Sequence, residues 1–248
     1  MAPIIKVGDR TLSAPELVDC LNRHQLMPRL IQELIIDDAI APITCDENEI
    51  AIAHQTFAQE HQLATEAEKV AWQQQRNLSP AAYEALVLRD IKLEKYKAST
   101  WASQVESYFL QRKTQLDRVL YSLIRTKDAG LAQELYFRIH DDGESFSDLA
   151  RQYSEGQEAQ TGGLVGPVEL SVPHPTLAKM LSISQPEQVW SPTRIGEWFI
   201  VVRLEKFVPA QMDDAMRQRL LNELFGQWLQ SQLQSSTVEV LSSVSDSA

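Results

Sequence analysis

Hydrophobic residues recur every three or four positions through the first half of the chain, which is the spacing of amphipathic helices. The clearest run carries Leu30, Ile31, Leu34 and Ile35 and stops before Pro42. Proline ends a helix because it cannot donate the backbone hydrogen bond that continues it. The pattern predicts five helices with short polar connections, over residues 13–24, 27–41, 44–61, 65–72 and 79–112.

Helix starts are marked by a Ser or Thr followed three residues later by Glu, the capping-box spacing. The pairs are Ser13 with Glu16, Thr44 with Glu47 and Thr65 with Glu68. Pro80 directly after Ser79 suits the first turn of the longest helix. These signals set the predicted starts of the helices.

The pattern changes after residue 116, where β-branched and aromatic residues become frequent. Residues 117–125 read as a strand, 131–139 and a segment capped by Ser145 or Ser147 as helices, and 197–207 as a final strand. Between them, three of the nine glycines fall within residues 161–170, followed by a short helix at 177–181. The predicted order is β-α-α-glycine loop-α-β-β. The glycine loop is no phosphate loop, because no Lys-Ser or Lys-Thr follows it.

A last amphipathic helix is expected over 212–233, before a Ser-rich end. Its apolar side, with Trp228 and Leu229, needs cover and is expected to return to the first helices. The predicted fold class is therefore α+β. Its parts are a helical domain over 1–115, a small antiparallel-sheet domain over 116–208, a C-terminal helix over 209–235 that completes the helical domain, and a flexible tail over 236–248.

The net charge of the chain limits the kinds of molecule that it is expected to bind. The net charge of −11 argues against nucleic acid and anionic membranes as partners. The stretch 89–127 is locally basic, with nine Lys or Arg against four acids, and is expected to pair with the acidic first 70 residues. A docking patch is the alternative. No run of 18 apolar residues predicts membrane insertion, and the N-terminus lacks a signal peptide's apolar region, so a cytoplasmic location is expected.

Candidate metal and thiol chemistry is sparse. Cys20 and Cys45 predict neither a disulfide framework nor a zinc site. His54 and His61 share a helical face without a third ligand at suitable spacing, so a partly buried pair is favoured over a metal site. His140 is expected to pair with the following acids at a helix end, and His174 to lie in a solvated loop or reach a pocket. No metal and no cofactor are predicted.

Three segments carry recognisable motifs. Residues 146–154 read F-S-D-L-A-R-Q-Y-S, residues 162–166 read G-G-L-V-G, and residues 196–205 form a strand that begins with glycine. Together they resemble the F-x-x-L-A-x-x-y-S helix, the G-G-D-L-G loop and the closing strand of the parvulin-type (PpiC-like) peptidyl-prolyl cis-trans isomerases. The resemblance covers about residues 117–207. The helical flanks resemble those of foldase-chaperones that carry such domains.

The resemblance also implies site positions. The family's first-strand histidine falls on Ser122, its loop Cys or Asp on Gly156, and its last-strand histidine on Trp198. The loop acid falls on Leu164, and the apolar pocket on Leu177, with Met180 and Leu181 close by. The catalytic positions are thus expected without their chemistry, and the substrate-binding residues are expected to be Leu164, Leu177, Met180 and Leu181.

The implied function is that of an isomerase-like foldase or chaperone that binds extended or Pro-containing polypeptide segments, with weak or absent catalysis. The alternative is a non-catalytic interaction module or maturation factor for a dedicated protein partner, as in a nitrogenase maturation protein of similar layout. A plain helical scaffold with an incidental β unit is a third hypothesis. A serine hydrolase is excluded because no G-x-S-x-G elbow occurs.

Overall fold

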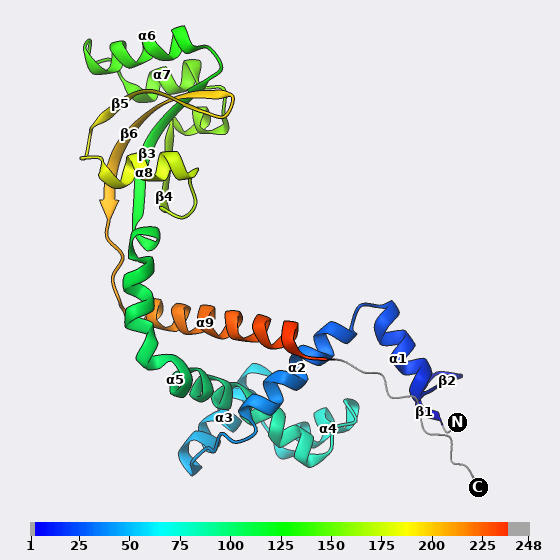
Figure 1. Ribbon diagram of the computed structural model, residues 1–248. Helices are drawn as coiled ribbons and strands as arrows, with labels where there is room; N and C mark the ends of the chain where they lie inside the picture. Colours follow the sequence, from blue (N-terminus) through cyan, green and yellow to red (C-terminus); the bar gives the residue numbers. More distant parts are fainter. Residues whose placement is uncertain (1–2, 238–248) are drawn as a thin grey trace. The chain divides into compact units, whose positions relative to one another are not determined.

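The computed structural model describes residues 3–237 (Figure 1). The chain divides into two compact units, one formed by the described parts of 1–105 and 217–248 and the other by 106–216. The predicted border at 115/116 lies at the end of the long helix α5, Pro80–Leu116. Each unit is described by itself.

The first unit is helical apart from one antiparallel hairpin near the N-terminus. Helix α9 begins within the last residues of the other unit and lies mostly in this one. The elements of the first unit are β1 (Pro3–Val7), β2 (Arg10–Ser13), α1 (Ala14–Arg23), α2 (Met27–Ile40), α3 (Glu47–Glu60), α4 (Glu66–Gln75), most of α5, and α9 (Asp214–Ser235). The five predicted N-terminal helices and the last helix are all present, whereas the pairing of β2 with β1 is an addition.

Two of the three predicted capping boxes start helices as expected, at Ser13 and Thr65. The prediction for α3 was wrong: its N-cap is Asp46, whose carboxylate accepts from the Glu49 amide at 2.9 Å. The same three-residue spacing occurs twice here, offset by two residues, so spacing alone does not separate the two boxes. A helix that began at Thr44 would start two residues before Asp46, the residue whose side chain accepts from the amide of the first turn.

Two hydrophobic clusters hold the first unit together. One joins α3 to α5 through Phe57, Tyr83 and Val87, all under a tenth exposed. The other joins α2 to α9 through Ile40 and Leu229, with partly buried residues of α5 around them. The last helix therefore packs on the N-terminal helices.

Ion pairs add to these contacts and account for the basic stretch. Arg89 of α5 pairs with Glu33 and Asp37 of α2, and Lys95 pairs with Glu49 of α3 at 2.6 Å. The expected pairing of the basic stretch with the acidic N-terminal part is confirmed at these residues.

The second unit is a four-stranded antiparallel sheet with helices on both faces (Figure 1). The strand order is β4-β3-β6-β5, so β3 and β6 are central. The elements are β3 (Arg118–Thr126), α6 (Ala129–His140), α7 (Phe146–Tyr153), the 3-10 helix η1 (Gln157–Thr161), β4 (Leu164–Glu169), α8 (Pro175–Ile183), β5 (Val189–Ile195) and β6 (Trp198–Val208). The glycine segment, predicted as a loop, is strand β4 from residue 164 onward. The predicted tail lies largely outside the described residues.

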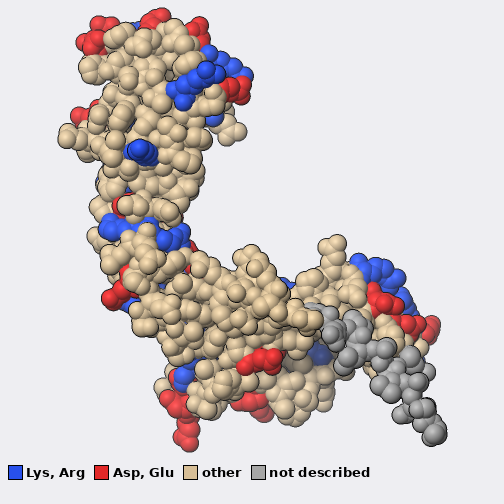
Figure 2. All heavy atoms as spheres, in the orientation of Figure 1, with Lys and Arg blue, Asp and Glu red and all other residues tan. Residues whose placement is uncertain are grey.

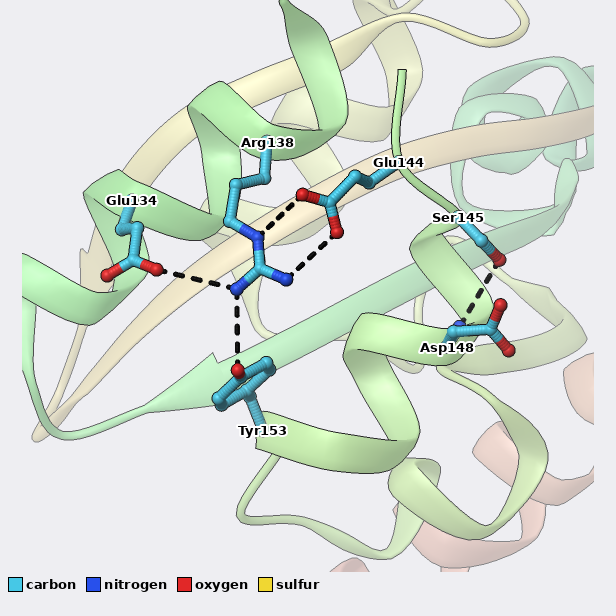
Figure 3. Close-up of polar contacts among 6 residues, drawn as sticks. All are labelled: Glu134, Arg138, Glu144, Ser145, Asp148 and Tyr153. Atoms are coloured by element: carbon cyan, nitrogen blue, oxygen red, sulfur yellow. Dashed lines mark hydrogen bonds and ion pairs between the residues drawn. The ribbon is translucent and has the colours of Figure 1, made fainter. Parts of the chain in front are cut away.

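Alternation along β3 gives the sheet its two cores. Tyr121 and Leu123 join the cluster that contains α8, whereas Ile124 joins the cluster under α6 and α7. On the α6–α7 side, Arg138 ties the two helices together (Figure 3). Its guanidinium donates to both carboxylate oxygens of Glu144 at 2.9 Å and to the Tyr153 hydroxyl at 3.4 Å. This pairing holds the pKa of Glu144 below its usual value.

Candidate functional site

The α8 face of the sheet carries most of the predicted site. Trp198, at the start of β6, packs against the same cluster as Leu177, Met180 and Leu181 of α8. These three residues of α8 are 6%, 7% and 0% exposed, so they form core more than an open pocket wall. Leu164 is 45% exposed, at the start of the edge strand β4. The structure therefore brings Trp198 and the α8 residues together and leaves Leu164 at the surface.

Ser122 is not part of this face. Its hydroxyl donates to Glu205, and it is paired in register with Arg203, whose guanidinium lies 5.1 Å from the Phe146 ring of α7. Side chains of neighbouring strand residues point to opposite faces, so a one-residue difference in alignment moves a side chain through the sheet. The neighbouring residue Tyr121 lies on the α8 face. Ser122 is therefore on the opposite face of the sheet from Trp198 and the α8 residues.

Gly156 lies where β3 meets the segment between α7 and η1. A β-carbon there would lie 2.0 Å from Arg125 Nε, 2.2 Å from Arg125 Nη2 and 2.2 Å from Glu158 Oε2. No side-chain atom tolerates such distances, so the guanidinium and the carboxylate already occupy the space of a side chain at 156. In this chain, Gly156 is glycine because Arg125 and Glu158 need the room.

Arg125 and Glu158 form the ion pair at the centre of this arrangement. Arg125 Nη2 lies 3.0 Å from Glu158 Oε2, and the Ser154 hydroxyl donates to the other oxygen at 2.6 Å. Glu158 is 8% exposed, and a carboxylate that deeply buried requires such partners. The Arg125 amide in turn donates to Ser154 Oγ at 3.1 Å, and the Glu155 amide donates to the Arg125 carbonyl at 2.9 Å. The pair thus fixes the α7–η1 segment on the end of β3.

Trp198 forms the outer part of the same cluster. The Arg125 guanidinium lies 5.5 Å and the Lys127 ammonium 4.9 Å from its ring centroid, within cation–π range. Lys127 also pairs with Glu197 at 3.0 Å. Where the family has a histidine on this strand, this chain has an indole between two cations.

Tyr121 is buried behind the ion pair. Burial raises the pKa of its hydroxyl, the nearby Glu158 carboxylate raises it further, and Arg125 lowers it. The hydroxyl is therefore protonated at neutral pH. It is a neutral group on β3, one residue before the position where the resemblance places a histidine.

The glycine segment positions β4 beside this cluster. Gly163 has φ +83, and a β-carbon there would lie 2.9 Å from the Leu123 carbonyl and 2.9 Å from Ala150 Cβ. Its own carbonyl accepts from the Leu123 amide at 2.8 Å. Gly163 therefore allows the chain before β4 to bond the backbone of β3 and to pack closely against the side chains of α7.

The remaining candidate residues have structural contacts. His54 lies 3.0 Å from a Glu84 oxygen, and the His61 ring packs 4.3 Å from that of Phe57. His140 lies 2.7 Å from an Asp141 oxygen, and His174 accepts from the Thr176 amide at the start of α8. Within residues 3–237, no group of three or more His, Cys, Asp or Glu could hold a metal ion.

The thiols, the helices and the charged surface add three findings. Cys20 and Cys45 are both free. None of the helices in residues 3–237 is long and apolar enough to cross a bilayer. On the face that Figure 2 shows, Lys and Arg form small groups separated by uncharged side chains, without an extended basic surface.

Sequence reasoning missed Tyr121, Arg125 and Glu158. One signal was present: Arg125 is a cation near the end of a strand whose middle is mostly apolar, four residues after Tyr121 and on the same side of the alternation. A second was Gly156 itself, at a position where the resembling family has a side chain.

Comparison with known proteins shows which family the sheet unit resembles. The sequence model of the rotamase family, the PPIC-type PPIase domain, matches residues 125–206. None of the curated proteins matches the chain.

Solved structures of similar fold include peptidyl-prolyl isomerases. PrsA from Bacillus cereus has 14% identity and a TM-score of 0.50, and the match covers 98% of this chain and 95% of that one. PrsA from Bacillus anthracis has 18% identity and a TM-score of 0.46 over 86% and 100% of the two chains. The parvulin domain of PpiD from E. coli has 26% identity and a TM-score of 0.35 over 40% and 97%.

The family match covers the sheet from Arg125 in β3 through β6, including Gly156, the glycine segment and Trp198. The likeness to B. cereus PrsA shows a shared fold. Residues 125–206 therefore belong to a parvulin, or PPIC-type peptidyl-prolyl isomerase, domain within an α+β architecture.

Proposed function

We propose that this protein is a foldase-type chaperone whose parvulin domain binds extended, Pro-containing polypeptide segments with weak or no isomerase catalysis. The observation that carries the proposal is the Arg125–Glu158 pair, which fills the side-chain space of Gly156 inside a retained parvulin domain.

The chemistry explains why this matters. Rotation about an X-Pro bond has a barrier of about 20 kcal/mol and takes tens of seconds without a catalyst. A catalyst must bind the twisted amide more tightly than the planar one. The five histidines of this chain lie outside β3 and β6, and Glu158 is already neutralised by Arg125. The polar groups that could respond to the twisted amide are therefore reduced, while the partly buried Trp198 ring, which packs on the α8 core, remains for binding a proline ring.

An alternative function is a binding module for one dedicated protein partner. The filled space at Gly156 favours it as much as it favours a weak foldase, since neither needs catalysis. Capture of a single protein in stoichiometric amount, with no binding of short proline peptides, would select the module over the foldase.

The direct experiment uses the full chain and a short X-Pro peptide. Binding is followed by the fluorescence of Trp198, with Trp198→Phe as the reference for the other tryptophans, and isomerisation by NMR exchange between the cis and trans peptide signals. We expect saturable binding and little or no acceleration. A matched peptide with alanine in place of proline should bind more weakly, and equal binding of both peptides would contradict the proposal.

The cytoplasmic location expected from the sequence belongs to this proposal as well. Fractionation of cells that produce the protein, with detection by a specific antibody, tests it, and recovery outside the cytoplasm would overturn it.

A further inference from the structure

A groove in the helical unit is lined only by residues of that unit. It has a volume of about 280 Å³ and runs between α3 and α5. Its floor and walls are mainly apolar, and its lining residues are Ile52, Ala53, Thr56, Phe57, Glu60, Val87, Asp90, Ile91 and Glu94. The volume is slightly below the range of about 300–1,000 Å³ for pockets that take drug-sized ligands, which suits a few side chains of a longer ligand.

The groove follows both helices for about two turns. Residues Ile52 and Glu60 are eight positions apart on α3, about 12 Å along the axis at 1.5 Å per residue. The helices are antiparallel here, because Lys95 pairs with Glu49 while His54 pairs with Glu84. Glu60 therefore lies toward one end of the groove and Glu94 toward the other.

The rim is acidic and the floor offers exposed apolar surface. The nine lining residues include three acids and no Lys, Arg or His. Within residues 3–237, Glu60 and Asp90 are exposed and have neither an ion pair nor a hydrogen bond, whereas Glu94 is engaged by Lys97 and Gln218. Ile52 is 49% exposed, a high value for a large aliphatic side chain beside a core cluster.

We propose that this groove binds a polypeptide segment whose apolar side chains are flanked by Lys or Arg. The apolar side chains would cover Ile52 and the floor, and the cations would face the two free carboxylates. Charge complementarity favours a basic segment, because the carboxylates of the rim repel an acidic or phosphate-bearing ligand. The chain's own residues 238–248 contain two acids and no Lys or Arg, so they do not have the required charge.

The inference is independent of the parvulin domain, since all nine lining residues belong to the helical unit. It defines a second class of client feature, basic and apolar, that needs no proline. A client bound at such a groove and at the parvulin domain would be held through two different chemistries.

The test uses fluorescence anisotropy of the full chain with two labelled, proline-free decapeptides. Both carry the same Leu, Phe and Ser core, and two lysines or two glutamates flank it at each end. We expect the lysine peptide to bind about tenfold tighter, with the preference falling as NaCl rises from 50 to 500 mM. The double variant Glu60→Gln/Asp90→Asn should lose two- to tenfold in affinity for the lysine peptide, at up to about fivefold per exposed pair.

Matched controls separate the site from net charge. Asp19→Asn/Asp38→Asn removes the same charge from exposed positions on α1 and α2 and should leave lysine-peptide binding within about twofold. Ile52→Gln, at a half-exposed position that tolerates a polar side chain, should weaken both peptides. Equal affinity for the two peptides, an equal loss in the control double variant, or unchanged binding by Ile52→Gln would each overturn the proposal.

Failure here is distinguishable from failure of the proposed function. If the X-Pro peptide binds at Trp198 but the lysine peptide is not preferred, only the proposal for the groove is refuted. If the groove binds in a way that depends on Glu60 and Asp90 but Trp198 does not respond to the X-Pro peptide, only the proposal for the parvulin domain is refuted.

Discussion

The geometry at Gly156 makes a sharp prediction for the substitution Gly156→Ala. The backbone there has φ −109, which alanine adopts without strain, so any cost must come from the added methyl group. That methyl group would lie 2.0 Å from Arg125 Nε and 2.2 Å from Glu158 Oε2, so both the guanidinium and the carboxylate have to shift. We expect this shift to weaken the ion pair between them.

The cost follows from what Glu158 loses. A buried acceptor deprived of its partner costs about 1–3 kcal/mol, more when it is charged. Two facts reduce the figure: the Arg125 side chain is 34% exposed, so solvent already screens the pair, and Gly→Ala stabilises by roughly 0.4–1 kcal/mol through the unfolded chain. The expected net destabilisation is about 1–2 kcal/mol. For a unit of this size, that lowers the melting temperature by roughly 4–10 °C.

Calorimetry of the full chain measures this, with the transition of the sheet unit separated from that of the helical unit. A double-mutant cycle with Arg125→Ala adds the decisive comparison. Once Arg125 is gone, the methyl group at 156 meets no guanidinium and only the Glu158 carboxylate still has to move, so Gly156→Ala should cost less than it does in the presence of Arg125. Unchanged stability of Gly156→Ala, or simple addition of the two costs, would refute the account of the site.

Other predictions test separate parts of the structure. Gly226→Ala, in the interior of α9 with no atom within 4 Å of the added methyl group, should stabilise the helical unit by about 0.5–1 kcal/mol in thermal unfolding. Leu229→Ala, at a position 7% exposed between α2 and α9, should destabilise the same unit by about 2–4 kcal/mol in urea titration. A chain ending at Pro209 lacks α9 and should lose the helical unit's cooperative transition, and retention of that transition in full would contradict the packing described. The pKa of Glu155 is lowered because the Thr126 hydroxyl and the Lys127 amide donate hydrogen bonds to its carboxylate. Its contribution to stability is therefore present above pH 4.5 and is lost as the pH falls through the folded-state pKa. Glu155→Gln should reduce the acid sensitivity of unfolding. Tyr121 has a raised pKa, so its contribution is present below about pH 10 and is lost as pH rises through the folded-state value, and Tyr121→Phe should reduce the loss of stability in alkaline titration.

Much of the fold could be predicted because it depends on local pattern. Periodic apolar residues and capping residues located the helices, and the β-rich run 117–125 located the central strand β3, residues 118–126. Strand β4 was not predicted, because Gly166 and Pro167 within it and two glycines directly before it give the segment little strand propensity of its own. It forms because it pairs with β3, with Val119 opposite Val168 and Tyr121 opposite Val165.

The site was harder to predict because it depends on which face a side chain takes. The alignment that placed a catalytic position on Ser122 differs by one residue from the position that faces α8, and the register of β3 also shifts between Leu120 and Tyr121. Sequence similarity does not resolve a single-residue difference where the matching side chains have changed. The partnership of Arg125 with Glu158 across 33 positions is likewise set by tertiary packing alone.

The same ion pair accounts both for the preserved fold and for the altered site. A side chain at position 156 would have to share the end of β3 with whatever residue 125 places there. In this chain residue 125 is an arginine that bonds Glu158, stacks near Trp198 and anchors the segment between α7 and η1 through its backbone. The space that a side chain at position 156 would need is therefore occupied by the Arg125–Glu158 ion pair, which has a structural role. A catalytic group cannot be regained by substituting Gly156 alone, because its first atom would displace the contact that keeps this segment in place.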